Sequence, residues 1–310
     1  MGFFEYLPAY ELNRSPRIIA AFEMDFLRNL DAFRKSIPQR EKFTMLLQLG
    51  WSAELAEVAA ELKTRLAEAR NAFPEARFII LANAPREVDI IREFAEVRLA
   101  QHNAFLDPKR YPLAKNGKRQ YDALYIARIT PFKRHELAKN IRNLHLIGSF
   151  AEKERDYFER TIEDFRHARW TQKVSSFLIG REICKAHCGL ALSATEGAMF
   201  SCGEYTLCGI PVVNTGNLGG RDTLLPDFAV KFAADTPESV AEAVEYWVEN
   251  PIEPEEIRRG FLEKALPQKQ DIQELVNSIA GKKVHLPHKL NIRCRLLPHT
   301  RILHGIRKIK

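Results

Sequence analysis

Two basic residues in the second half of the chain have the spacing to bind one diphosphate group. Arg128 and Lys133 follow an apolar run at 121–128, YDALYIAR. Two cations at this spacing suit two oxygens of a diphosphate. Cations are disfavoured at a helix N-terminus, where the helix dipole is already positive, so an anion shared between them best explains their position. The alternative is a solvated basic segment at the start of a helix.

Two glutamates could accept hydrogen bonds from hydroxyl groups in the same pocket. Glu196 precedes Gly197, where the backbone could turn sharply into a helix whose first N–H groups face a ligand. Glu204 lies further along this helix, within about 80° of the face of Glu196. Both carboxylates could therefore reach the hydroxyls of a sugar or a ribose. The alternatives are that Glu196 only complements the helix dipole and that Glu204 is exposed to solvent.

A third segment with ligand-binding character is TGNLGGRD at 215–222. Its glycines, Gly216, Gly219 and Gly220, would let the backbone approach a ligand closely. An ordinary flexible loop is the alternative.

These three segments follow strands of a predicted parallel sheet. Apolar runs predict strands at 121–128, 144–148, 189–195, 210–215 and 228–233. The intervening segments predict helices at 134–141, 152–165, 175–187, 197–208 and 237–249. Strands that alternate with helices form right-handed βαβ units and a parallel sheet. Ligands of such sheets bind beyond the carboxyl ends of the strands, where the three segments lie.

The first 118 residues are predicted to be α/β with few strands. Apolar residues at helical spacing predict a helix over 18–33, whereas 43–50 is either a buried strand or the start of a helix. We expect Ser52 as the N-cap of a long helix and Pro85 in the first turn of the next. Further strands are expected at 77–81 and 97–101.

The polar segment at 107–120, which contains two prolines and a glycine, predicts a linker between two domains. We therefore expect a first domain at 1–118, a second at 119–281 and a basic tail at 282–310.

Taken together and in this order, these segments resemble the retaining glycosyltransferases of the GT-B fold. The class in question is the large group 1, or family 4-like, class that includes sucrose-phosphate synthases and bacterial mannosyl- and glucosyltransferases. Its pattern is a Glu, seven residues, a second Glu, and then a small-residue turn followed by Pro-Val-Val. Here the pattern consists of Glu196, Glu204 and the run CGIPVV at 208–213. The resemblance covers about 121–250, and NAFLD at 103–107 is similar to the segment that leads these enzymes into their second domain.

The resemblance implies an α/β, GT-B-like fold of two Rossmann-like domains with parallel sheets, the amino-terminal one reduced. It also implies a role for each site residue. Arg128 and Lys133 would hold the donor diphosphate and stabilise its charge as the glycosidic bond breaks. Glu196 would contact the donor sugar, and Glu204 the ribose hydroxyls. Glu196, Lys133 and Arg128 are then the catalytic residues, and donor contacts are expected from Arg128, Lys133, Gly197, Ala198, Met199, Phe200, Glu204, Gly219 and Gly220.

The implied function is transfer of a hexose from a nucleotide-diphosphate sugar to a glycan or lipid-linked acceptor, with retention of the anomeric configuration, in polysaccharide biosynthesis. The resemblance implies metal-independent chemistry, with no cofactor expected, and the absence of an Asp-x-Asp motif from the sequence is consistent with it.

The chain departs from the family pattern in both halves. Ala198 and Met199 replace the Phe-Gly that commonly follows the first Glu-Gly. The first domain is shorter than usual, with Gly50-Trp51-Ser52 as its candidate glycine loop. Its single histidine, His102, lies just ahead of the linker and does not match the position of the histidine that these enzymes often place near the donor sugar. A non-catalytic nucleotide-sugar-binding module with a degenerate acceptor domain therefore remains an alternative.

The net charge of +7 is concentrated at the C-terminal end. From residue 275 onward there are nine basic residues and no acidic ones, which leaves 38 of the 47 basic residues against 40 acidic ones. The charge therefore does not indicate nucleic-acid binding, and no basic platform with interleaved aromatic residues supports it. The tail could contact an anionic membrane surface peripherally. The alternatives are that it packs back on the first domain or is disordered. With no signal peptide and no apolar run near the roughly 20 residues of a membrane-spanning helix, we expect a cytoplasmic protein, with contact to the inner face of the membrane as a further option.

The five cysteines do not form the pattern of a disulfide-rich secreted domain. Cys184, His187 and Cys188 suggest a zinc site, but no second ligand pair follows at a suitable spacing. Packing of buried thiols in predicted helices is the favoured interpretation.

Overall fold

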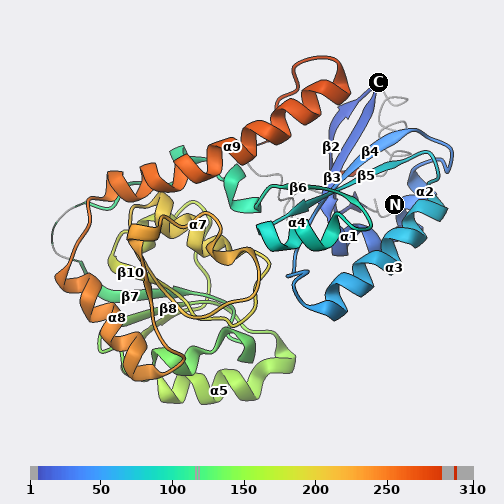
Figure 1. The fold of residues 1–310 in the computed structure, drawn as a ribbon. Helices are drawn as coiled ribbons and strands as arrows, with labels where there is room; N and C mark the ends of the chain where they lie inside the picture. Colours follow the sequence, from blue (N-terminus) through green and yellow to red (C-terminus); the bar gives the residue numbers. More distant parts are fainter. Residues whose placement is uncertain (1–5, 116, 118, 288–296, 299–310) are drawn as a thin grey trace, which may run out of the picture. The chain divides into compact units, whose positions relative to one another are not determined.

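The computed structural model describes residues 6–115, 117, 119–287 and 297–298. These residues divide into two compact units (Figure 1). Unit 1 consists of the described residues within Met1–Phe105 and Pro267–Lys310, and unit 2 of those within Leu106–Leu266.

Unit 1 is built on a five-stranded sheet in the order β2-β3-β4-β5-β6. The strands are β2 (Ala9–Arg14), β3 (Arg17–Phe22), β4 (Phe43–Gln48), β5 (Arg77–Ala82) and β6 (Glu96–Leu99). β2 is antiparallel to β3, and the other pairs are parallel. Its helices are α1 (Glu23–Leu27), α2 (Leu30–Ser36), α3 (Ala56–Ala72) and α4 (Pro85–Ile91), and β1 (Tyr6–Leu7) pairs antiparallel with β13 (Leu297–Pro298).

The predicted helix over 18–33 is wrong in its first third. Ile18 and Ile19 lie in β3, where both are buried, and the chain becomes helical only at Glu23. A strand that is buried on both faces has a continuous apolar run, which by itself cannot be distinguished from a buried helix. The ambiguous segment 43–50 contains β4, so the sheet has more strands than expected.

The start of the long helix is also later than predicted. α3 begins at Ala56 with Leu55 as its N-cap, and the Ser52 hydroxyl instead accepts a hydrogen bond from the Glu54 backbone N–H at 3.2 Å. The predictions of Pro85 in the first turn of a helix and of strands near 77–81 and 97–101 are confirmed by α4, β5 and β6.

Unit 2 contains a six-stranded parallel sheet in the order β12-β11-β10-β7-β8-β9. The strands are β7 (Tyr121–Ile126), β8 (Leu144–Ile147), β9 (Arg169–Thr171), β10 (Ala186–Ala191), β11 (Val212–Asn214) and β12 (Val230–Phe232). From the centre of the sheet, β7, β8 and β9 follow one another in one direction, and β10, β11 and β12 follow one another in the other. This is the doubly wound Rossmann order, whose ligands bind where the direction of strand order reverses. The reversal lies between β7 and β10.

The helices of unit 2 are shorter than predicted around the sheet's central strands. Only the 3₁₀ turn η4 (His135–Ala138) occupies the predicted helix 134–141, and α6 (Ile179–Ile183) occupies part of 175–187. The other helices are α5 (Arg155–Asp164), α7 (Phe200–Leu207), α8 (Pro237–Glu249) and α9 (Pro254–Ala280). α8 coincides with its predicted range, whereas α9 falls in a segment for which the sequence analysis made no prediction.

The two units meet between Phe105 and Leu106 and between Leu266 and Pro267. The sequence analysis expected domain boundaries at 118/119 and 281/282. The segment expected to be a linker packs within unit 2, where the Ala114 N–H donates to the Cys208 carbonyl at 2.8 Å. The Arg258 guanidinium likewise donates to the Tyr111 and Leu207 carbonyls. α9 belongs to both units and changes unit at Pro267, a residue that lacks the N–H of a helix hydrogen bond.

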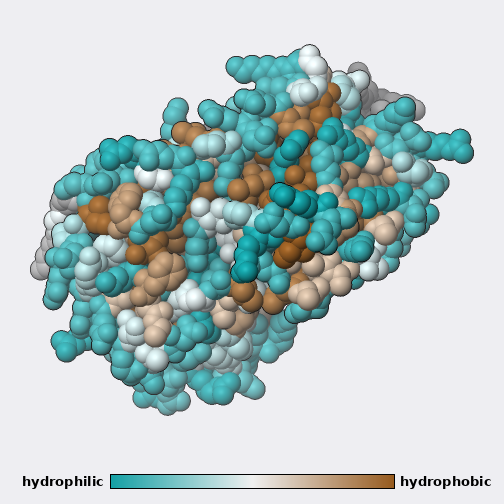
Figure 2. All heavy atoms as spheres, in the orientation of Figure 1, coloured by the Kyte–Doolittle hydropathy of each residue, from teal (hydrophilic) through white to brown (hydrophobic). Residues whose placement is uncertain are grey.

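Most of the predicted basic tail lies outside the described residues, and so does the predicted membrane contact. Among the helices that the structure describes, none combines the length and apolar character needed to cross a bilayer. Hydrophilic side chains cover much of the visible face of the molecule (Figure 2).

Candidate functional site

The candidate site lies in unit 2, at the carboxyl ends of the two strands that flank the reversal of strand order. Lys133 follows β7 in the 3₁₀ turn η3 (Pro131–Lys133), and Glu196 follows β10. The two side chains are separated by 63 residues of sequence, are both buried, and form an ion pair in direct contact. The Ser193 hydroxyl donates a second hydrogen bond to the same Glu196 oxygen at 3.0 Å.

The charge of Lys133 depends on this ion pair. Burial and the positive charges of Arg221 and Arg128 together lower the pKa of its ammonium from 10.5 to about 7. The Glu196 carboxylate opposes this effect, because an opposite charge in contact favours the charged form. The contact with Glu196 therefore favours the ammonium form of Lys133. An incoming anion would offer Lys133 a second negative partner.

Arg221 is a buried cation that the sequence analysis did not include in the site. Its side chain is fully buried and donates to the Ser193 carbonyl at 2.5 Å and to the Thr215 carbonyl at 2.6 Å. Its Nε also donates to Asp222 at 3.0 Å. The guanidinium thus joins the segments that follow β10 and β11, and its charge acts on Lys133. Its position next to the glycines of 215–222 was the available signal, but the sequence analysis considered only the backbone of that segment.

Backbone pairing joins the second and third predicted segments. The Glu196 N–H donates to the Leu218 carbonyl at 3.0 Å, and the Gly220 N–H donates to the Gly197 carbonyl at 2.7 Å. Gly219 has φ 107°, a conformation that favours glycine. The predicted donor glycines Gly197, Gly219 and Gly220 are therefore brought together beside Glu196.

Arg134 is a second residue that the sequence analysis missed. It has a left-handed backbone conformation, φ 50°, directly after Lys133. Its guanidinium donates to the Leu192 carbonyl at 2.5 Å, to the Thr215 hydroxyl at 2.8 Å and to Asp235 at 2.7 Å. Arg134 therefore fixes the Lys133 turn to the neighbouring strand ends, and its charge is already engaged.

Arg128 is the exposed cation of the site. Its guanidinium lies 5.8 Å from the centre of the Phe132 ring, and the Lys133 ammonium lies 5.0 Å from the same centre. Arg128 and Lys133, the two residues predicted to bind the diphosphate, thus both lie near the Phe132 ring. Their side chains therefore belong to the same part of the site.

Glu204 has a different set of neighbours from Glu196. It is partly buried in α7 and accepts a hydrogen bond from the Tyr111 hydroxyl at 3.0 Å. Burial and the Glu204 charge raise the pKa of Tyr111, so this hydroxyl remains a donor.

α7 begins at Phe200, after the buried residues Ala198 and Met199, so the predicted helix start at 197 is three residues early.

Gly148, which follows β8, lets the backbone run close to the end of β7 just before Arg128. A Cβ atom at this position would lie 1.8 Å from the Ala127 carbonyl oxygen. We expect Gly148→Ala to separate the two segments and to lower the free energy of unfolding by about 1–3 kcal/mol, because a backbone obstacle cannot rotate away. Thermal unfolding measures the effect. Gly216→Ala is the matched control, since nothing lies within 4 Å of its added Cβ. An unchanged melting temperature for Gly148→Ala would contradict the close approach.

The remaining sequence candidates are not part of this cluster. His102 is buried in unit 1, with its ring edge-on to Phe22 at a centroid distance of 6.2 Å. His187 and Cys188 are consecutive residues of β10, so their side chains leave opposite faces of the strand and cannot converge on one zinc ion. Cys188 is buried in the strand rather than in a predicted helix.

Comparison with known proteins identifies the fold. Neither family models nor curated proteins give a match to the sequence. Among solved structures, a mutant of S. aureus TarM in complex with fondaparinux, alpha-GlcNAc-glycerol and UDP matches with a TM-score of 0.63 and 16% identity, over 84% of this chain and 54% of TarM. Sucrose-phosphate synthase from Thermosynechococcus elongatus matches with a TM-score of 0.59 and 15% identity, over 86% of this chain and 74% of the synthase. Anabaena HepE in complex with UDP matches with a TM-score of 0.61 and 15% identity, over 84% of this chain and 78% of HepE.

The chain thus spans about half the length of TarM and about three quarters of the other two proteins. These likenesses confirm the predicted GT-B-like α/β fold. The sheet of unit 2 is parallel as predicted, whereas the sheet of unit 1 contains one antiparallel pair, β2 and β3, and each neighbour is covered only in part.

Proposed function

We propose that the protein is a retaining glycosyltransferase that transfers a hexose from a nucleotide-diphosphate sugar to a glycan or lipid-linked acceptor without a metal. The observation that supports this most is the Lys133–Glu196 ion pair at the carboxyl ends of β7 and β10. The pair lies where a doubly wound sheet binds nucleotides. It combines a cation that can bind a diphosphate, Lys133, with a carboxylate that can accept hydrogen bonds from hydroxyl groups, Glu196.

In this proposal, each predicted residue keeps the role that its position supports. Arg128, which is exposed, and Lys133 bind the donor diphosphate. Backbone groups of Ala198, Met199 and Phe200, just before and at the start of α7, meet the phosphate or the sugar hydroxyls. Gly219 and Gly220 let the loop backbone approach the donor.

The two glutamates bind hydroxyl groups. Glu196 accepts from the donor sugar once Lys133 turns to the diphosphate, and Glu204, oriented by Tyr111, accepts from the ribose. In the reaction, the bond between the anomeric carbon and the diphosphate oxygen breaks, and its electron pair stays on the phosphate. The acceptor oxygen bonds to the anomeric carbon on the same face, and its proton passes to the leaving phosphate oxygen. Lys133 and Arg128 stabilise the charge that develops on that phosphate.

Several neighbours in the structure comparison support a nucleotide-sugar donor. The TarM complex contains UDP. HepE, which is 15% identical to this chain, has also been crystallised with UDP-glucose. A pneumococcal O-GlcNAc transferase that matches with a TM-score of 0.52 was crystallised with UDP and GlcNAc. These ligands favour a transferase over a module without catalysis.

Thermal shift with UDP-, GDP- and ADP-sugars tests the donor site. One of these donors should raise the melting temperature of the wild type. Lys133→Ala and Glu204→Ala should lose this stabilisation, and Arg128→Gln should weaken donor binding about tenfold, because a charge-assisted hydrogen bond to phosphate is removed. Arg142→Gln is the matched control, since this exposed arginine precedes β8 and lies at the amino ends of the strands, away from the donor site.

Donor hydrolysis then separates catalysis from binding. Slow release of free hexose by the wild type, abolished in Lys133→Ala, would support the transferase. Tight binding without any hydrolysis or transfer would instead support the non-catalytic module. If none of the three nucleotide sugars stabilises the wild type, the proposed donor site is wrong.

A further inference from the structure

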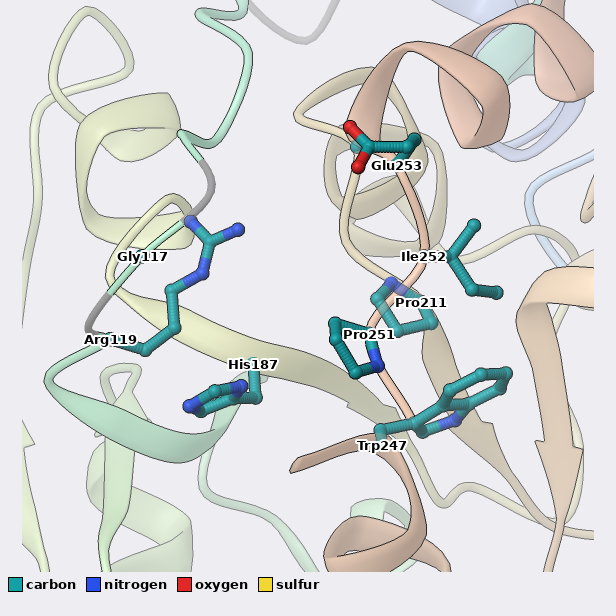
Figure 3. A pocket seen from close by; sticks show the side chains of 9 residues that line it. Gly117, Arg119, His187, Pro211, Trp247, Pro251, Ile252 and Glu253 are labelled. Carbon is teal, nitrogen blue, oxygen red and sulfur yellow. The ribbon is translucent and has the colours of Figure 1, made fainter. Parts of the chain in front are cut away.

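A pocket of about 340 Å³ lies in unit 2 at the amino ends of the strands, whereas the candidate donor site lies at their carboxyl ends (Figure 3). Three of its lining residues mark the amino ends of adjacent strands. Arg119 precedes β7, His187 is the second residue of β10, and Pro211 precedes β11. The donor site lies at the carboxyl end of the same β10, and six strand residues span about 20 Å. The pocket is therefore separate from the site already described.

One wall of the pocket is apolar. Trp247 in the last turn of α8 is 4% exposed, and Pro251 and Ile252 follow in the connection to α9. Figure 3 shows these side chains with Pro211 on one side of the pocket. Gly209, which also lines it, has φ 75°, and a Cβ there would lie 2.5 Å from Pro254. The glycine therefore keeps the turn after α7 close to the start of α9 and so shapes this wall.

The opposite wall carries positive charge. Figure 3 shows Arg119 and His187 facing the apolar wall. Arg119 is partly buried and donates one hydrogen bond to the Cys184 carbonyl at 2.8 Å, while burial lowers its pKa. Within the described part of the chain, Arg119 has no carboxylate in ion-pair contact. Its remaining N–H groups are therefore available to an anion.

Other titratable groups complete the electrostatics of the pocket. Burial lowers the pKa of His187 and the Arg119 charge lowers it further, while Asp122 raises it. His187 is thus neutral at pH 7 and can donate or accept a hydrogen bond beside the guanidinium. Glu253 is exposed at the rim, where Figure 3 shows it away from His187. A ligand must keep its negative charge near Arg119 and away from Glu253.

We propose that this pocket is a second ligand site, which binds a small organic anion with a compact apolar body. The anionic group, a carboxylate or a phosphate, pairs with Arg119 and hydrogen-bonds to His187. The apolar body packs on Trp247 and the prolines. The volume of the pocket is near the lower end of the roughly 300–1,000 Å³ of small-molecule sites, which suits a ligand of one ring.

Phenyl phosphate and benzoate are the probes, with benzyl alcohol as the neutral comparison. The chain has three tryptophans, so the indole N–H resonance of Trp247 can be assigned by single Trp→Phe replacements and followed in a titration. We expect at least one of the two anions to shift this resonance saturably, and benzyl alcohol to bind about tenfold more weakly because it lacks the charge. The preferred anion distinguishes a phosphate ligand from a carboxylate ligand.

Substitutions at Arg119 test the role of the cation. Arg119→Met should weaken binding of the preferred anion about tenfold, whereas Arg119→Lys should retain most of it. Arg142→Met is the matched control, because this arginine lies at the same edge of the sheet outside the pocket. No shift of the Trp247 resonance, equal binding of the neutral probe, or full binding by Arg119→Met would each overturn the proposal. Stabilisation by a nucleotide sugar should be the same in Arg119→Met as in the wild type, so this site and the donor site fail independently.

Discussion

Replacing Glu196 by alanine is expected to lower the free energy of unfolding by about 3–5 kcal/mol at pH 6, because it leaves the Lys133 ammonium buried without its partner. The penalty should depend on pH. In the folded wild type, burial and the charges of Arg221 and Arg128 lower the pKa of Lys133 to about 7. Loss of the opposite charge of Glu196 should lower this pKa further. Between the folded-state pKa values of the variant and the wild type, the wild type holds a proton that the variant has released, so the difference in stability shrinks as the pH rises. The difference from the wild type is then largest below pH 7 and smallest above it.

Urea unfolding at pH 6 and pH 9.5 measures this difference. A Lys133→Met/Glu196→Leu double variant should recover most of the loss at pH 6, since neither charge then remains in the site. The exposed helix pair Arg65–Glu61, with an N–O distance of 2.7 Å, is the control, and Glu61→Ala should cost less than about 1 kcal/mol. An equal cost of Glu196→Ala at both pH values would show that the buried charge of Lys133 is not the cause.

Replacing Glu23 by glutamine is expected to stabilise the protein at pH 8 by on the order of 4 kcal/mol, and at pH 5 by less than about 1 kcal/mol. Glu23 lies directly after β3 and accepts a hydrogen bond from the Gly50 N–H at 2.8 Å. Burial raises the pKa of its carboxyl from 4.5 to about 8. Between these values the folded protein holds a proton that the unfolded chain has released, so wild-type stability falls as the pH rises through this range. Glutamine is never ionised and keeps an oxygen for the Gly50 N–H.

Melting temperatures from pH 5 to pH 8 measure the effect. Some decline should remain in Glu23→Gln, because burial also raises the pKa of Glu87 to about 7. The exposed Glu57 on α3 is the matched control, and Glu57→Gln should follow the wild-type curve. If Glu23→Gln has the same pH dependence as the wild type, the buried carboxyl of Glu23 does not titrate in this range.

Unit 2 shows which features of the fold could be predicted from the sequence. Every strand predicted at 121–128, 144–148, 189–195, 210–215 and 228–233 contributes to the observed sheet. A short apolar run between polar segments is a local property, and alternation with helices limits the connections to a parallel sheet. Residues 186–187 were predicted to be helical instead of part of β10, because the pairing of this segment with β7 is not visible along the chain.

Unit 1 shows where local patterns fail. Apolar residues at 18–22 fit a helix, but pairing of β3 with both β2 and β4 makes this segment a strand. α9 joins residues from 267 onward to the first unit, although the start of the same helix belongs to the second. Both outcomes depend on partners that are distant in sequence, so tertiary packing overrides the local preference.

The sequence by itself determined the residue types of the candidate site and the strand ends at which they lie. It placed cations after one strand, a glutamate after another and glycines after a third, and the rule for parallel sheets put these segments at one edge. Only the tertiary structure decided that Lys133 pairs with Glu196, that Arg221 and Arg134 fix the strand ends, and that Glu204 bonds to Tyr111. The reason is that burial and hydrogen-bond partners arise between segments tens of residues apart, whereas periodicity and charge are properties of the local sequence.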